Sequence, residues 1–266
     1  MPDITRRGFI LTAAAASSAI LLGSALTGCG STGANGPGAA KRLTVAASPT
    51  PHAKILSEFA APKLKDQGIE LTVKEYTDYI IPNQVTSSGE VDANYFQHIN
   101  YLDNYNEKNG TDLVGVAAIH YEPFGIYAGT SSDLLSIADG AQIAVPNDPT
   151  NEGRALLLLQ QEKIIRLSNP NDLEATATSV ADNPHNVRLV EVEAAAVPRQ
   201  LQDVNFAVIN GNYAIEAGMH ASYALAVESA QGVAVQQYAN YIVTTPDKKD
   251  DERIAALVFG PHPLGR

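Results

Sequence analysis

Apolar and polar residues follow two repeating patterns from Leu43 onward. Period-two alternation is typical of strands, and apolar residues at i, i+3 and i+4 are typical of helices. The strand-like runs are "LTVAAS", "IELTVKEY", "LVGVAAIH", "FGIYAG", "AQIAVPN", "NVRLVEVEA", "NFAVIN" and "YIVTT". Helical patterns cover "HAKILSEFAAPKLKDQG", which ends at Gly68, and the ranges Ile99–Lys108, Gly153–Glu162, Leu173–Ala181, Ala195–Gln202 and Glu252–Val258. Strands that alternate with helices predict an α/β protein with parallel sheets.

Two polar junctions interrupt this alternation, at Tyr121-Glu122-Pro123 and around Ser229–Tyr238. If the segment between them forms its own sheet, the chain crosses between two lobes twice. The predicted lobes are residues 43–121 plus 238–266 and residues 122–237, with a ligand cleft between them. The alternative is a single sheet with a long insertion, which the pattern alone does not exclude.

The first 28 residues have the layout of an export signal. "TRRGFI" places Arg6 and Arg7 before an Ala-rich apolar run that ends in "LTGC". A transmembrane helix is the alternative, but small residues followed by a cysteine fit cleavage better. Cys29 is the only cysteine, so no internal disulfide is possible, and we expect it to carry a lipid such as palmitate. Residues 29–42, rich in glycine, are the expected tether.

The charge balance excludes one class of partner. The chain holds 18 basic and 29 acidic residues, and loss of residues 1–28 changes its formal charge from −11 to −12. So acidic a surface argues against nucleic acid and against electrostatic attachment to anionic lipid. Membrane attachment would then depend on the lipid at Cys29.

Catalytic and cofactor motifs have little support. The chain contains no G-x-S-x-G elbow, no Walker loop and no H-E-x-x-H. "GCGSTG" matches G-x-G-x-x-G but lacks the strand–turn–helix context that a dinucleotide site requires, so we expect no cofactor. No two of the six histidines have the i, i+4 spacing of paired metal ligands, and no metal site is predicted. The alternative, a metal-binding protein, would have to gather His52, His98 and His120 in space.

Arg154 lies in "VPNDPTNEGRALLLLQ", at the predicted start of a helix. A cation in the first turn of a helix adds to the positive end of the helix dipole, which is unfavourable. The sequence therefore indicates that an anion is bound near Arg154.

Aromatic residues gather in two further segments. "DYIIPNQ" offers Tyr79, and "VDANYFQHINYLDNYN" places Phe96, His98 and Tyr101 around a strand-to-helix turn, where binding residues of α/β folds concentrate. Core packing is the alternative. Asn210 and Asn240 end or open buried strands, where an asparagine also commonly caps a helix or a turn.

These segments together resemble a known family. "VPNDPTNEGRALLLLQ", "GEVDANYFQHINYLDNYN", "DYIIPNQ", "LVEVEAAAVPRQLQDV" and "AVINGNYAIEAG" are similar to the NlpA/MetQ family of lipoproteins, the methionine-binding components of ABC importers. The resemblance implies a two-lobed, type II-like periplasmic-binding-protein fold that closes over one amino acid. It places the ligand arginine at Arg154, the side-chain pocket at Tyr79, Phe96, His98 and Tyr101, and two polar asparagines at Asn210 and Asn240.

The resemblance also supplies a chemical role for each group. The α-carboxylate would bind to Arg154 and to the backbone N–H groups at the helix N-terminus. The asparagines would hold the ammonium, and the thioether would contact the aromatic rings. The end "GPHPLGR" departs from the family, in which one or two further helices are expected.

The resulting hypothesis is a non-enzymatic receptor, lipid-anchored on the extracytoplasmic face of the cell membrane. It would bind L-methionine and deliver it to a permease and its ATPase subunit. Another ligand, a methionine-containing dipeptide or a different apolar amino acid, is the first alternative. The second, from another class, is an exported enzyme that acts on a small carboxylate.

Overall fold

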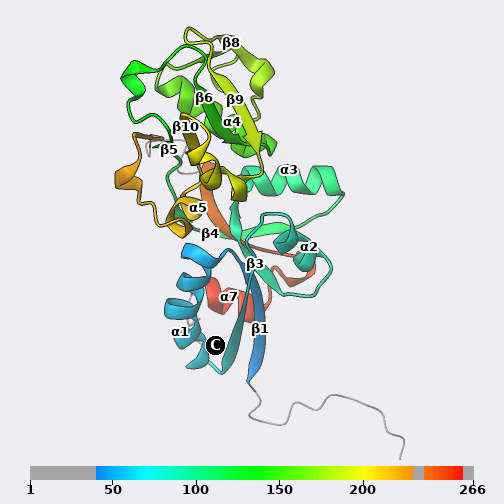
Figure 1. Ribbon diagram of the computed structural model, residues 1–266. Helices are drawn as coiled ribbons and strands as arrows, with labels where there is room; N and C mark the ends of the chain where they lie inside the picture. The colour runs from blue at the N-terminus through cyan, green and yellow to red at the C-terminus, as the bar shows by residue number, and fades with distance from the viewer. Residues whose placement is uncertain (1–39, 230–236, 260–266) are drawn as a thin grey trace, which may run out of the picture. The chain divides into compact units, whose positions relative to one another are not determined.

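The computed structural model describes residues 40–229 and 237–259. The predicted export signal, Cys29 and the segment "GPHPLGR" lie outside the described residues. The described residues belong to one compact unit that contains two five-stranded sheets (Figure 1). A division of this unit into two independent lobes stays a prediction.

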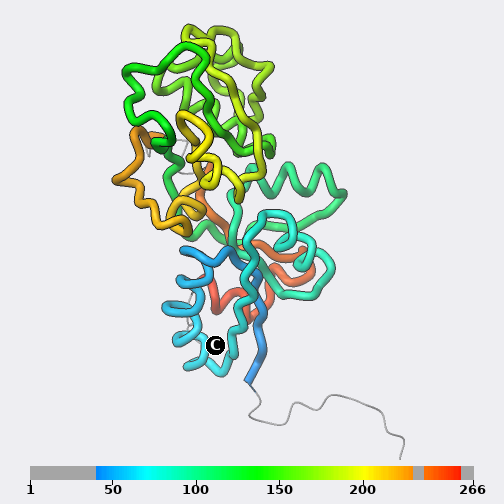
Figure 2. Tube along the Cα trace, in the orientation of Figure 1, coloured from blue at the N-terminus to red at the C-terminus, as the bar shows by residue number. Residues whose placement is uncertain are grey.

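The first sheet combines the two ends of the described chain. Its strand order is β2-β1-β3-β12-β4, and the strands are β1 (Lys41–Ala47), β2 (Ile69–Glu75), β3 (Ala93–His98), β4 (Val114–Tyr121) and β12 (Ala239–Thr244). Strand β1 is parallel to β2 and β3, whereas β12 is antiparallel to β3 and β4. Helix α7 (Glu252–Phe259) packs against β1 through the fully buried Ile254, so the red and blue ends of the trace lie side by side (Figure 2).

The second sheet is built from the middle of the chain. Its order is β11-β5-β10-β6-β9, and the strands are β5 (Gly125–Ala128), β6 (Gln142–Pro146), β9 (Arg188–Val192), β10 (Phe206–Ile209) and β11 (Ala226–Val227). All four residues of β10 are buried, as expected for a strand covered on both faces. The strands β7 (Arg166–Leu167) and β8 (Val180–Asp182) form a separate pair.

The α/β class is confirmed, but the prediction of parallel sheets is wrong in part. Strand β5 is antiparallel to β10, and β12 is antiparallel to both neighbours in the first sheet. Strand β5 follows β4 through the short connection at residues 122–124, without a helix between them. Without a crossover helix, nothing requires an entering strand to be parallel.

The helices are α1 (Ala61–Lys65), α2 (Ile81–Ser87), α3 (Ile99–Asn109), α4 (Pro149–Gln161), α5 (Gly211–Glu216) and α7, with helical turns at Pro49–Ala53, Ile55–Ala60, Leu134–Ser136, Ala177–Ser179, Ala194–Gln202, Ala221–Tyr223 and Pro246–Lys248. Helix α4 begins four residues before the predicted Gly153. The Asp148 side chain accepts a hydrogen bond from the backbone N–H of Asn151, and Pro149 stands at the first helical position. Arg154 therefore lies in the second turn, and the idea of a cation in the first turn is wrong.

The helix predicted at Leu173–Ala181 is wrong as well. Only Ala177–Ser179 is helical, as a single turn before β8. The backbone N–H groups of Asn171 and Glu174 bond to the side chains two residues earlier. Asn and Asp side chains that bond to nearby backbone compete with helix formation, which explains the difference.

Helix α4 provides the main apolar contact with the second sheet. Helix α4 covers the second sheet with Ala155, Leu156, Leu158 and Leu159, all at most 1% exposed. Burial of each leucine stabilises the fold by about 1.5–3 kcal/mol.

Within the described ranges no helix combines the length and the hydropathy that a membrane crossing requires.

Candidate functional site

One pocket contains all seven residues that the sequence proposed for ligand binding. It encloses about 330 Å³ of free space, open solvent included. Its lining comprises the predicted Tyr79, Phe96, His98, Tyr101, Arg154, Asn210 and Asn240, together with Gln97, Glu122, Asn151, Gly211 and Asn212. Their role in binding stays a prediction, but their convergence is a property of the fold.

The strand ends explain the convergence. Strand β3 ends at His98, and β12 pairs with it so that Asn240 stands opposite His98. In the second sheet, β10 ends just before Asn210. Strand β6 leads into the capped helix α4, which carries Arg154. The pocket is therefore lined by the ends of strands from both sheets, where ligands of α/β proteins usually bind.

The anion next to Arg154 is part of the chain. Arg154 Nε donates to Glu228 Oε2 at 2.9 Å, and Nη2 donates to Glu228 Oε1 and, at 2.9 Å, to the backbone oxygen of Glu122. Arg154 is 5% exposed and Glu228 8% exposed. Glu228 also accepts hydrogen bonds from the Tyr121 hydroxyl and from the backbone N–H of Phe124. The sequence analysis missed this bidentate pair because the two residues are far apart in the chain.

Three aromatic rings surround the guanidinium. Its central carbon lies 4.2 Å from the ring centroid of Tyr238, 4.8 Å from Phe124 and 5.9 Å from Tyr121. Burial disfavours the charge, but the Glu228 carboxylate outweighs this effect and raises the pKa of Arg154. Among the described residues, the hydrogen bonds of the guanidinium use only Nε and Nη2. Nη1 has no hydrogen-bond partner among the described residues.

An amide network lies beside Arg154. Asn210 donates to Asn151 Oδ1 at 2.8 Å, and Asn212 accepts a hydrogen bond of 2.5 Å from the Tyr79 hydroxyl. Within the described residues, Asn210 Oδ1 and Asn212 Nδ2 are buried without a partner. Buried polar atoms almost always have a hydrogen-bond partner. An unpaired acceptor and an unpaired donor in one pocket therefore indicate a ligand that has both a hydrogen-bond donor and an acceptor.

The opposite end of the pocket is aromatic. The ring of Tyr79 lies 5.7 Å from Phe96, 5.8 Å from Tyr101 and 4.9 Å from Tyr213. The Tyr101 hydroxyl donates to the backbone oxygen of Tyr79 at 2.9 Å, which fixes both rings. Such contacts form a rigid apolar slot.

His98 joins the two ends. It caps helix α3, because its Nδ1 accepts a hydrogen bond of 3.2 Å from the backbone N–H of Tyr101. Burial, assisted by the charge of Arg154, lowers the pKa of His98 to about 3, although the bond to Asn151 opposes this shift. The imidazole is therefore neutral at physiological pH.

Gly211 permits a close approach between two segments of the backbone. A Cβ at this position would lie 2.7 Å from the Cβ of Glu122 and 3.1 Å from the backbone oxygen of Pro123. The glycine thus allows α5 to approach the segment that connects the two sheets. The expected backbone N–H groups at the start of α4 are engaged by Asp148, so a ligand carboxylate does not find them free.

Comparison with known proteins agrees with this architecture. Residues 43–259 match the NlpA lipoprotein family. The D-methionine-binding lipoprotein MetQ of Escherichia coli is 38% identical over 210 residues, which cover 76% of this chain and 75% of that protein. A lipoprotein crystal structure from Ruminococcus gnavus has 50% identity and a TM-score of 0.81, and covers 83% of this chain and 91% of the other.

A further structure, a nutrient-binding protein from Burkholderia cenocepacia bound to methionine, has 35% identity and a TM-score of 0.76, and covers 81% of this chain and 89% of the other. These matches confirm the expected periplasmic-binding-protein fold. The chain belongs to the NlpA lipoprotein family.

Proposed function

We propose that this protein is the substrate-binding component of an ABC importer and that it captures L-methionine in the pocket between the two sheets. The observation that carries the proposal is the pairing of unsatisfied polar atoms at one end of the pocket with an aromatic slot at the other. A relative is named for D-methionine binding and a structural match contains methionine, which supports the same ligand class.

In this arrangement the α-carboxylate binds to Nη1 of Arg154 and to Nδ2 of Asn212. The ammonium donates to Asn210 Oδ1 and to the amide oxygen of Asn240. Because Glu228 already neutralises Arg154, the polar end favours a net neutral zwitterion over a free anion. The thioether contacts Tyr79, Phe96 and Tyr101, where sulfur–aromatic contacts contribute about 0.3–1.5 kcal/mol each.

The alternatives have less support from the pocket. The polar atoms that remain unpaired, Asn210 Oδ1 and Asn212 Nδ2, match the ammonium and the carboxylate of one free amino acid. The described pocket lining contains no serine, cysteine or lysine nucleophile, which argues against an enzyme that acts on a small carboxylate through one of these groups. We therefore propose binding and release without covalent chemistry.

Calorimetry tests the assignment directly. Purified protein should bind L-methionine with one site and a higher affinity than leucine or a methionine-containing dipeptide. D-methionine, titrated in parallel, measures the stereochemical preference. Tighter binding of the dipeptide would shift the ligand class, and turnover of any ligand without a partner protein would contradict the receptor.

We also propose attachment to the extracytoplasmic face of the membrane through a lipid on Cys29, and delivery to a permease and its ATPase subunit. A Cys29→Ser change should release the protein from membranes and leave methionine affinity unchanged. Continued fractionation with membranes would contradict the lipid anchor. Replacement of Arg6 and Arg7 by lysine should block export through the twin-arginine route.

A further inference from the structure

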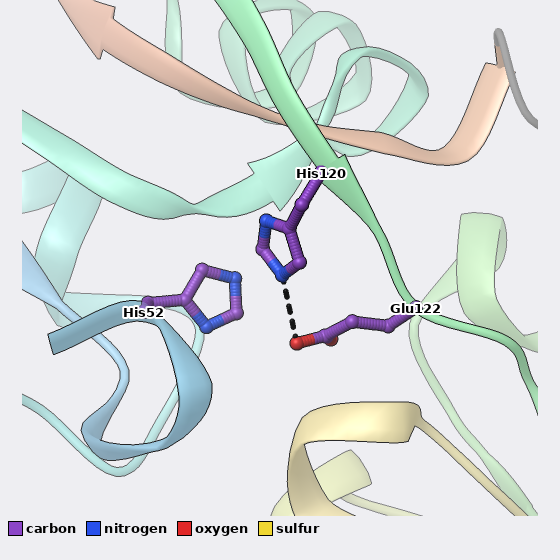
Figure 3. Close-up of side chains that lie close together, drawn as sticks. All are labelled: His52, His120 and Glu122. Carbon is purple, nitrogen blue, oxygen red and sulfur yellow. Dashed lines mark hydrogen bonds and ion pairs between the residues drawn. The ribbon is translucent and has the colours of Figure 1, made fainter. Parts of the chain in front are cut away.

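Three potential metal ligands meet beside the pocket and are not explained by methionine binding. His52 comes from the helical turn after β1, His120 lies near the end of β4, and Glu122 follows β4 on the first connection between the sheets. One ligand atom from each residue lies within 4.8 Å of the other two. His120 Nε2 and Glu122 Oε1 are 3.0 Å apart, and the imidazole of His52 faces them (Figure 3).

The spacing resembles that of ligands around one small ion. Atoms bonded to a zinc ion at about 2.0–2.1 Å lie roughly 3.3 Å apart in tetrahedral geometry. His120 and Glu122 already have such a separation, whereas the three ligand atoms together lie within 4.8 Å of one another. Asn240 Oδ1, 3.1 Å from His52 Nε2, accepts the hydrogen bond of that nitrogen and leaves Nδ1 for an ion, which His52 has to approach more closely.

The buried imidazole of His52 has a nitrogen available for an ion. His52 is fully buried, and its Nδ1 has no hydrogen-bond partner among the described residues. A neutral imidazole has one nitrogen without a proton, which is the form that binds metals. Glu122 supplies a carboxylate with a side chain only 10% exposed.

Tyr95 supplies an outer contact of the usual kind. Its hydroxyl lies 2.5 Å from Nδ1 of His120. If His120 binds an ion through Nε2, its proton moves to Nδ1 and is donated to the Tyr95 oxygen. Metal-binding histidines nearly always donate their second N–H to such a partner, which orients the ring.

An ion also has a path to the site. His120 and Glu122 line a separate cavity with about 650 Å³ of free space, open solvent included, on the side that also carries His220. The side chain of His120 is 20% exposed. The cluster is thus buried enough to strip water from an ion and open enough to admit one.

We propose that His52, His120 and Glu122 bind one divalent transition-metal ion of the zinc type. Two imidazoles and one carboxylate suit zinc, with the fourth position open to water. The metal-binding alternative of the sequence analysis included His98, but the structure places Glu122 in that role and His98 in the methionine pocket.

The proposed site touches the methionine pocket at two points. Asn240 lines that pocket, and the backbone oxygen of Glu122 accepts a hydrogen bond from Arg154. A bound ion would hold both residues in place. The metal site itself does not rest on the proposed function, so zinc binding and methionine binding are tested separately.

The first experiment titrates zinc into protein that carries no polyhistidine tag. The wild type should bind one ion, and His120→Gln should weaken zinc binding at least about tenfold, since even outer contacts of metal ligands change affinity 10–100-fold. The exposed His185 and the cavity residue His220 are matched controls, and their glutamine variants should bind zinc as the wild type does. Equal zinc affinity of wild type and His120→Gln, or a loss with His220→Gln alone, would overturn the proposal.

A second measurement needs no variant. Cobalt(II) added to the wild-type protein should give the intense visible absorption of a four-coordinate ion, and zinc should remove this absorption at one equivalent. The weak absorption of hydrated, six-coordinate cobalt, unchanged by the protein, would contradict a site of this geometry even if His120→Gln failed to fold.

Discussion

The polar and the aromatic ends of the pocket differ in how their side chains are paired. At the polar end, the charge of Arg154 is compensated by Glu228 before any ligand enters, and the groups that remain unpaired are single N–H and C=O groups. At the aromatic end, Tyr79, Phe96 and Tyr101 contact one another and present little besides ring surface. In the proposed binding mode, the polar end selects by hydrogen-bond direction, and the aromatic end by shape and polarisability.

This difference shows why a buried arginine need not attract every anion. A buried guanidinium without a counter-ion would be costly, and its pairing with Glu228 offsets that cost. The N–H groups that remain unpaired at the polar end are directed donors, which suit the carboxylate of a zwitterion. The following substitutions either disrupt the pairing of Arg154 with Glu228 or measure its effect.

Arg154→Ala should have the largest effect. It removes the donors of Nη1 and also leaves Glu228 buried without a counter-ion, at a cost of about 3–5 kcal/mol in the free energy of unfolding. Methionine binding should weaken by about 2–5 kcal/mol, or roughly thirty-fold to several-thousand-fold. Arg154→Lys should restore only part of the affinity, because an ammonium keeps the charge and loses the fork.

Ligand-induced shifts of melting temperature check this prediction. The wild type should gain stability with methionine by mass action, and Arg154→Ala should gain almost none at the same concentration. Equal gains would show that Arg154 serves only the internal pair with Glu228.

Glu228→Gln tests the compensation itself. The amide keeps the shape of the carboxylate but leaves Arg154 with an unbalanced charge, so stability should fall by about 1.5–3 kcal/mol. The uncompensated guanidinium of Arg154 should then bind simple anions better. Thermal shifts with methionine and with an analogue that lacks the ammonium measure this change. The wild type should prefer methionine, and the preference should shrink in Glu228→Gln; an unchanged preference would contradict the charge argument.

His98→Asn tests the neutral imidazole between the two ends. The folded pKa of about 3 lies below the ordinary value of 6.5, so the unfolded chain binds the proton more readily between these values. This contribution to stability is complete above pH 6.5 and is lost as pH falls toward 3, by up to about 1.4 kcal/mol per pH unit. Asparagine retains the cap of α3.

Chemical denaturation of both proteins from pH 7.5 to 4.5 gives the readout. The difference between their free energies of unfolding should be constant above pH 6.5 and should change below it. A constant difference over the whole range would show that His98 titrates normally.

Phe96→Ala should have the smallest effect on binding. Loss of one sulfur–aromatic contact should weaken methionine binding by about 0.3–1.5 kcal/mol and reduce the preference over smaller amino acids. Phe59, which is 64% exposed, provides the control, and Phe59→Ala should bind like the wild type. Calorimetry with methionine and alanine measures this preference. Phe96→Ala should weaken the binding of methionine more than that of alanine, whereas Arg154→Ala should weaken the binding of both alike.

The amino-acid sequence was sufficient for local features. Alternation predicted eight of the ten strands in the two large sheets, since a strand buried on one or both faces must carry apolar residues at fixed spacing. The runs of strand-like residues did not include the central strand β3 or the two-residue strand β11. Asp148 and Pro149 are the cap and the first residue of α4, whereas the run of leucines led to a predicted start at Gly153. The segment at Leu173–Ala181 shows the limit of such patterns, because side-chain bonds to the backbone overrode a weak helical periodicity.

The pocket residues were found from the sequence through segments that resemble a family, and the structure brings those segments together. Their mutual arrangement depends on register: Asn240 pairs with His98 on one side and with His120 on the other. A shift of β12 by one residue would turn Asn240 to the other face of the sheet. Nothing in the local pattern of "YANYIV" specifies that register.

Charge pairing was decided only by the tertiary structure. The sequence indicated an anion near Arg154 from the helix dipole, on the premise of a first-turn position that the structure does not bear out. The anion is needed because Arg154 is buried, and a buried cation is costly without a partner. The sequence did not indicate Glu228, which is 74 residues away and reaches Arg154 only after the chain has crossed the second sheet. The same holds for His52, His120 and Glu122. Local sequence determines which side chains each strand or helix carries, whereas long-range packing determines which charges and ligands meet.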